Sequence, residues 1–171
     1  MPGSFKRDLF LGIAAGVAGT AAMDGYWAAL SKLRPRTASG GGGEPTTEKV
    51  ACRMLRLAGV QSPSRQTLQL GGQVVHWSYG INWGIAAGVS RSLGVPLTRG
   101  MGLPFGAALW AFGDTWMLEK LKLAKPPSEY PLHVHASALG AHLIYGLTLW
   151  AVLTSLGRVQ KPKSQLRRWA A

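Results

Sequence analysis

The chain has 171 residues, about one domain's worth, and its 19 Lys and Arg residues against 7 Asp and Glu give a formal net charge of +12. Hydrophobic residues make up 47% and the mean hydropathy is +0.09, which does not separate a soluble protein from a membrane protein. Charged residues, however, are nearly absent from four windows and crowd between them, as in membrane proteins. Because anionic headgroups attract basic residues that flank such windows, we expect a lipid bilayer with anionic headgroups as the partner, and no nucleic acid.

The first apolar window covers residues 9–33 and follows Lys6 and Arg7. We predict a transmembrane helix here. A cleaved signal peptide is the alternative, because a basic start before an apolar run has that shape. No small-x-small cleavage site precedes Asp24, and the apolar character continues to Leu30, which favours the transmembrane helix.

Residues 35–72 form a long connection outside the membrane, and it opens with a run of glycines at 40–43. Within it, residues 46–58 alternate apolar and basic side chains at helical spacing, namely Val50, Met54 and Leu57 against Lys49, Arg53 and Arg56. Two interpretations remain open. The segment is either an amphipathic helix lying in the headgroups or a helix that caps the bundle.

Three further windows follow, at residues 74–93, 103–118 and 136–156. The first two are near the lower limit of about 17 residues for crossing a hydrocarbon core. The last is the clearest. The basic tail at 158–171 is expected to lie in solvent or among headgroups. The single cysteine, Cys52, excludes a disulfide within this chain and is expected to be structural.

The windows repeat in pairs. His76 and His142 each begin the string H-x-x-Y-G-aliphatic, and Asp24 and Asp114 each follow a glycine by eight positions and precede an aromatic residue by two. A two-helix unit returns the chain to its starting side, so the two copies should be parallel. The predicted fold is therefore an all-α, integral membrane four-helix bundle, built of two tandem helical hairpins related by a pseudo-two-fold axis along the membrane normal.

This arrangement gathers six polar residues near the hairpin loops: Asp24, Asp114, His76, His142, Tyr79 and Tyr145. An aspartate near the middle of a membrane helix costs roughly 2.5 to 3.5 kcal/mol, so such groups face a partner or water. Three interpretations are open: the aspartates lock the hairpins through hydrogen bonds, the cluster handles protons or ions, or two of its histidines, His76 and His142, ligate a haem. We favour the structural lock, without catalytic residues, metal or cofactor.

Three prolines, Pro126, Pro127 and Pro131, predict a stiff turn before the last helix. His133 and His135 follow this turn. Together with His142 they suggest a metal site, but a further ligand is lacking, and we expect the pair to cap the helix at the headgroup level.

The strings GxxAGxxGTxxM in the first helix, HWSYGINWG in the second and PPSEYPLHVHASALGAHLIYGLTL before and within the last are similar to those of the YagU-like family of bacterial inner-membrane proteins. The resemblance covers most of the chain. It implies a multi-pass protein of the bacterial inner membrane and brings no catalytic residues. The chain departs from the family after Asp114, where Thr115, Trp116 and a basic run at 120–125 replace an acidic and apolar stretch.

The positive-inside rule does not orient the bundle, because nine Lys and Arg residues lie on the face of the termini and ten on the other. We expect both termini in the cytoplasm, since part of the long connection lies far from the spans. The sequence has no Gly-rich phosphate cradle, Ser-His-Asp arrangement or HExxH string, so we expect no enzyme but a structural or stress-related membrane protein. Four short, Gly-rich spans favour a homo-oligomer or a larger membrane complex.

Overall fold

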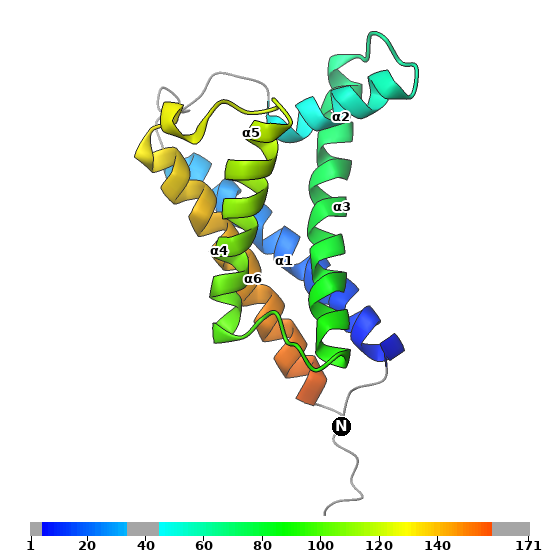
Figure 1. Ribbon diagram of the computed structural model, residues 1–171, viewed down its shortest axis with the longest axis vertical. Coiled ribbons are helices and arrows are strands. Elements are labelled where there is room, and N and C mark those ends of the chain that lie inside the picture. Colours follow the sequence, from blue (N-terminus) through cyan, green and yellow to red (C-terminus); the bar gives the residue numbers. More distant parts are fainter. Residues whose placement is uncertain (1–4, 34–44, 159–171) are drawn as a thin grey trace, which may run out of the picture.

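The computed structural model describes residues 5–33 and 45–158. The glycine run at 40–43 and the predicted tail beyond residue 158 lie outside the described residues. The described part of the chain is helical and contains no strand, which confirms the all-α prediction (Figure 1).

The described helices are α1 (Phe5–Leu33), α2 (Thr46–Leu57), α3 (Arg65–Ser92), η2 (Gly100–Gly102), α4 (Leu103–Leu109), η3 (Trp110–Met117), α5 (Leu118–Lys120), η4 (Pro127–Glu129) and α6 (Leu132–Arg158). The elements α4, η3 and α5 form one continuous helical segment, whose middle part, η3, is a π-helix. In Figure 1, α1, α3, this segment and α6 alternate in direction. The start of α1 and the end of α6 therefore lie at one end of the molecule, and α2 lies at the other.

The length of α3 differs from the prediction, which placed a span at 74–93. Ser64 caps α3, and its hydroxyl accepts a hydrogen bond from the backbone N–H of Thr67 at 3.1 Å. The two additional turns at the start of α3 pack against α2. Ala51 of α2 lies against Gly71 of α3, so closely that a Cβ added to Gly71 would lie 2.9 Å from the Cβ of Ala51. The helix predicted at 46–58 thus sits on the end of α3.

Two helices, α1 and α6, are long and apolar enough to cross a membrane. Neither α3 nor any of the shorter elements α4, η3 and α5 is both long and apolar enough by the same measure. By length and composition, two of the four predicted spans are supported. Many large apolar side chains are exposed on the described helices, including Phe10, Leu70, Val74, Phe112 and Trp116.

Glycines bring the two helices of each hairpin into close contact. A Cβ added to Gly84 of α3 would lie 2.4 Å from the Cα of Gly16 in α1. In the second hairpin, a Cβ added to Gly146 of α6 would lie 2.2 Å from the carbonyl oxygen of Gly102. Real side chains do not approach so closely, so only glycine allows these backbones to touch.

The hairpins meet where α1 crosses α6, and the core lies at this crossing. Gly19 of α1 faces Tyr145 and Leu149 of α6, and Leu149 is fully buried. A strict two-fold axis would pair α3 with the segment of α4, η3 and α5 in the same way, but no comparably close packing joins them. The bundle is therefore closed on one side and more open on the other.

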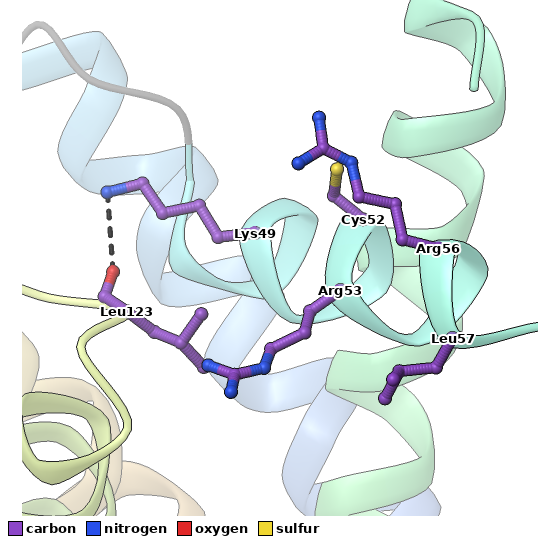
Figure 2. A pocket seen from close by; sticks show the side chains of 6 residues that line it. All are labelled: Lys49, Cys52, Arg53, Arg56, Leu57 and Leu123. Carbon is purple, nitrogen blue, oxygen red and sulfur yellow. Dashed lines mark hydrogen bonds between the residues drawn. The ribbon is translucent and has the colours of Figure 1, made fainter. Parts of the chain in front are cut away.

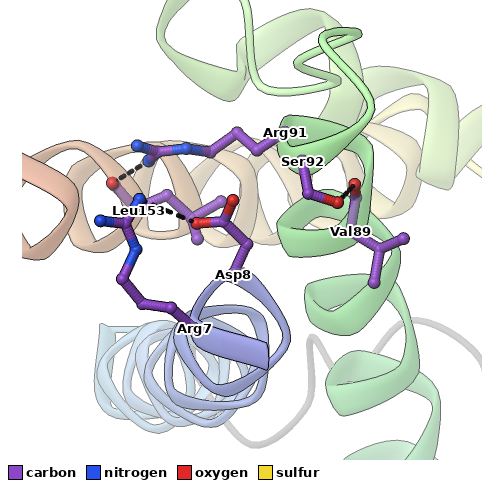
Figure 3. Close-up of polar contacts among 6 residues, drawn as sticks. All are labelled: Arg7, Asp8, Val89, Arg91, Ser92 and Leu153. Atoms are coloured by element: carbon purple, nitrogen blue, oxygen red, sulfur yellow. Dashed lines mark hydrogen bonds and ion pairs between the residues drawn. The ribbon is translucent and has the colours of Figure 1, made fainter. Parts of the chain in front are cut away.

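Polar contacts also join the helices at the end of the molecule where α1 starts (Figure 3). The guanidinium of Arg91 donates a hydrogen bond to the carbonyl oxygen of Leu153 and so ties α3 to α6. Asp8, which is only 2% exposed, lies 3.4 Å from the guanidinium of Arg7. These contacts lie far from the predicted polar cluster, which belongs to the hairpin-loop end.

Candidate functional site

The first Asp–His pair joins α1 to α3. His76 Nε2 lies 3.0 Å from Asp24 Oδ1, which is an ion-pair distance, although the ring N–H is not aligned for a hydrogen bond. The pair forms because α1 and α3 are antiparallel, so that the sixth turn of α1 lies beside the fourth turn of α3. The Asp24 side chain is 42% exposed and that of His76 is 25% exposed, so the carboxylate remains partly accessible.

The second pair joins η3 to α6 in the same way. His142 Nδ1 lies 3.8 Å from Asp114 Oδ2 and 2.9 Å from the carbonyl oxygen of Ala138 one turn earlier in α6. A proton on Nδ1 would be donated to Ala138, which leaves Nε2 as an acceptor in the neutral ring. His142 is 13% exposed and Asp114 is 39% exposed. Each hairpin thus holds an aspartate beside its own histidine.

The π-helix η3 carries Asp114 and changes the register of the second hairpin. Gly16 of α1 packs against Gly80, and Asp24 then reaches His76, one turn away from Gly80 on α3. In the second hairpin, Gly106 packs against the backbone of His142, and Asp114 reaches the ring of the same residue.

A regular α-helix would carry Asp114 farther from Gly106 along the axis. A π-helix bonds residue i to i+5 and so places more residues in each turn. Its wider winding therefore brings the carboxylate back beside His142. The π-helix is rare and appears mostly as single turns within α-helices, frequently at functional sites, so η3 draws attention to the position of Asp114.

The two hairpins are connected through the tyrosines. The hydroxyl of Tyr145 on α6 donates a hydrogen bond to the carbonyl oxygen of Gly80 on α3. The hydroxyl of Tyr79 is buried, and its interaction with the side chain of Trp83 does not have hydrogen-bond geometry. It faces Gly113 in η3, where an added Cβ would lie 2.7 Å from it. The repeat therefore supplies two equivalent tyrosines, and only one of them is bonded.

Charge interactions link the two pairs. Asp114 interacts electrostatically with His76 as well as with His142, and with Tyr79. Of the six predicted residues, the structure pairs Asp24 with His76 and Asp114 with His142, while Tyr145 is bonded to the backbone of Gly80 and Tyr79 lies beside η3. Aromatic rings fill the space beside it, because Trp83 makes edge-on contacts with Tyr79 and with Phe105 of α4 at centroid distances of 6.1 and 6.0 Å.

The remaining histidines lie outside this cluster. His135 Nε2 lies 2.8 Å from the carbonyl oxygen of Pro127, and its ring contacts those of Trp110 and Tyr130 edge-on. His133 is exposed. Among residues 5–33 and 45–158, no three His, Cys, Asp or Glu side chains are placed to hold a metal ion. In the haem interpretation, the rings of His76 and His142 would both face one haem iron. In the structure, each ring lies beside the aspartate of its own hairpin.

Several features of the site were missed by the sequence analysis. The π-helix has no sequence signature, because the spacing from Gly106 to Asp114 is the same as in the regular helix α1. The bond from Tyr145 to Gly80 was also missed, because it joins residues 65 positions apart and no sequence spacing indicates it. Asp8, next to Arg7 at the start of the first window, could have been noted as a buried charge.

Comparisons with protein families, curated proteins and solved structures gave no match. The similarity to the YagU-like family therefore depends on the three sequence strings described above. What the molecule does has to be argued from the polar cluster and from the surfaces around it.

Proposed function

We propose that the chain is a multi-pass protein of the bacterial inner membrane, related to the YagU-like family, in which four helical segments cross the bilayer. The apolar helices α1 and α6 support this proposal, as do the large exposed apolar side chains. Residues 66–90 contain no Asp, Glu, Lys or Arg, and residues 100–118 contain only Asp114. At 28 residues, α3 is about 42 Å long, which exceeds the hydrocarbon core of about 30 Å.

The role that the geometry supports best is structural: the Asp–His pairs lock the two hairpins. The observation that carries this proposal is that each aspartate contacts the histidine of its own hairpin, at 3.0 Å for Asp24 and 3.8 Å for Asp114. Attraction between opposite charges strengthens where water is scarce. Breaking a fully buried pair costs about 3 to 5 kcal/mol, and these half-exposed pairs should contribute less.

Neutralising the aspartates tests the lock. Asp24→Asn and Asp114→Asn should each lower the free energy of unfolding by about 1 to 2 kcal/mol, which is below the cost of breaking a buried pair. Glu129→Gln is the matched control, because Glu129 forms an exposed ion pair with Lys125 at 3.5 Å, and such pairs contribute little. Thermal unfolding in a mild detergent measures the stability of the three variants. Equal stability of all three would exclude the lock.

A second function is favoured by the connection between the pairs. Asp114 interacts with both histidines, and the buried hydroxyl of Tyr79 lies beside the same π-helix. A chain of groups that bind and release protons could carry protons into the bundle, since histidine titrates near neutral pH. Vesicles that contain the parent protein and a pH-sensitive dye would show proton flux above that of empty vesicles. The flux should be lost in Asp114→Asn and retained in Glu129→Gln.

A further inference from the structure

A groove of about 530 Å³ lies between α2 and the segment that follows α5. Its lining is cationic and apolar, and consists of Lys49, Cys52, Arg53, Arg56, Leu57 and Leu123 (Figure 2). We propose that this groove binds the phosphate headgroup of an anionic phospholipid. The inference rests on the proposed membrane location but does not depend on the Asp–His lock.

Two of the three cations are held in place by the chain itself. The Lys49 ammonium donates a hydrogen bond to the carbonyl oxygen of Leu123 at 3.3 Å, and the Arg53 guanidinium donates one to that of Leu121 at 3.0 Å. These carbonyls come just after α5 and have no helical partner of their own. The bonds bridge α2 to the far wall of the groove and fix the positive charges on either side of it. A guanidinium has five N–H donors, so Arg53 keeps further donors for a ligand.

The positive charge of the groove is not neutralised by neighbouring carboxylates. No ion pair with Lys49, Arg53 or Arg56 occurs in the described ranges. The carboxylate of α2, Glu48, is buried against Gly72 of α3. The guanidinium of Arg56 makes no hydrogen bond to a described residue, and in Figure 2 this side chain extends over Cys52. Arginine binds phosphate through paired hydrogen bonds, so an anion with several oxygens fits this set of donors.

Apolar side chains beside the cations indicate an amphiphilic ligand. Leu57, which lines the groove beside the cations, is 83% exposed, and Leu123 lines the opposite wall. A free phosphate has no apolar surface to pack against these side chains, whereas the acyl chains and glycerol of a phospholipid can cover them. The elements that border the groove, α2 and α5, lie at the hairpin-loop end of the bundle, where proposed spans leave the bilayer (Figure 1). Basic residues at this level attract anionic lipids.

Native mass spectrometry of the full chain in mild detergent tests the proposal. The probes are phosphatidylglycerol, phosphatidylcholine with the same acyl chains, and inorganic phosphate. The parent should bind phosphatidylglycerol at least tenfold more tightly than phosphatidylcholine, since each basic residue attracts anionic lipid by about 1 kcal/mol. The double variant Arg53→Gln/Arg56→Gln should lose most of this preference. Lys6→Gln/Arg99→Gln removes the same charge from exposed sites outside the groove and should keep it.

Arg53→Gln also removes the bond to Leu121, so Arg56→Gln alone is the decisive variant if the double variant fails to fold. It should weaken phosphatidylglycerol binding about fivefold, in line with the loss of one basic contact of about 1 kcal/mol. Three results would overturn the proposal: no preference in the parent, an equal loss in the Lys6 and Arg99 variant, or inorganic phosphate that binds as tightly as the lipid. Asp24→Asn should leave the preference unchanged, which keeps this test separate from that of the lock.

Discussion

The hydroxyl of Tyr145 on α6 donates a hydrogen bond to the carbonyl oxygen of Gly80 on α3, so a side chain of the second hairpin is bonded to the backbone of the first. The equivalent tyrosine of the first hairpin, Tyr79, makes no hydrogen bond of regular geometry in the described part of the chain, and its hydroxyl interacts with the side chain of Trp83. The two positions therefore form a matched pair, in which the same substitution removes a bond at one site and none at the other.

Tyr145→Phe should lower the free energy of unfolding by about 1 kcal/mol, the usual net contribution of one hydrogen bond. Tyr79→Phe should be neutral or slightly stabilising, because it removes a buried hydroxyl that makes no hydrogen bond of regular geometry to a described residue. Thermal unfolding of both variants in the same detergent measures the difference. A larger loss in Tyr79→Phe would contradict the assigned bonding.

Gly84→Ala should separate α1 from α3. The added Cβ would lie 2.4 Å from the Cα of Gly16 and 2.5 Å from the carbonyl oxygen of Gly12, and backbone atoms cannot rotate away. Forced overpacking costs typically about 1 to 3 kcal/mol. Gly25→Ala is the control on the same hairpin, because a Cβ there meets nothing within 4 Å, and alanine favours a helix by about 1 kcal/mol. The two variants should shift the unfolding midpoint in opposite directions.

The stability of the turn before α6 depends on His135 and not on the neighbouring His133. His135→Ala should cost about 1 kcal/mol, since the ring bonds to the carbonyl oxygen of Pro127 at 2.8 Å. His133→Ala should have no measurable effect, because that ring is exposed. Thermal unfolding with and without added zinc distinguishes a structural role of His135 in the turn from a metal site formed by the two histidines. A zinc-dependent stabilisation that either variant abolishes would favour the metal.

The sequence predicts the elements that repeat and fails where the repeat is broken. Apolar windows predict α1 and α6, and the matching strings around His76 and His142 lead to the same Asp–His contact in each hairpin. The π-helix at Asp114 was not predictable, because helix winding depends on how η3 packs and the spacing of residues does not record it. The early start of α3 at Arg65 follows from its contact with α2, and a hydropathy window does not see such contacts.

The single cysteine of the chain reports the orientation of the bundle. Cys52 lies on α2, at the end opposite to the start of α1, and is partly exposed. If both termini are cytoplasmic, a membrane-impermeant maleimide added to intact cells that allow it to reach the periplasm should label Cys52. A Cys52→Ser variant gives the background. Labelling that requires lysis would place α2 on the cytoplasmic side.

The central claim is that Asp24 and His76 stabilise the first hairpin by acting on each other. A double-mutant cycle with Asp24→Ala, His76→Ala and the combined variant measures this directly, through the free energy of unfolding in mild detergent. We predict a favourable coupling of about 1 kcal/mol, within the range found for residues in contact. The combined variant should then be more stable than the two single losses imply. Strict additivity of the two substitutions would contradict the account.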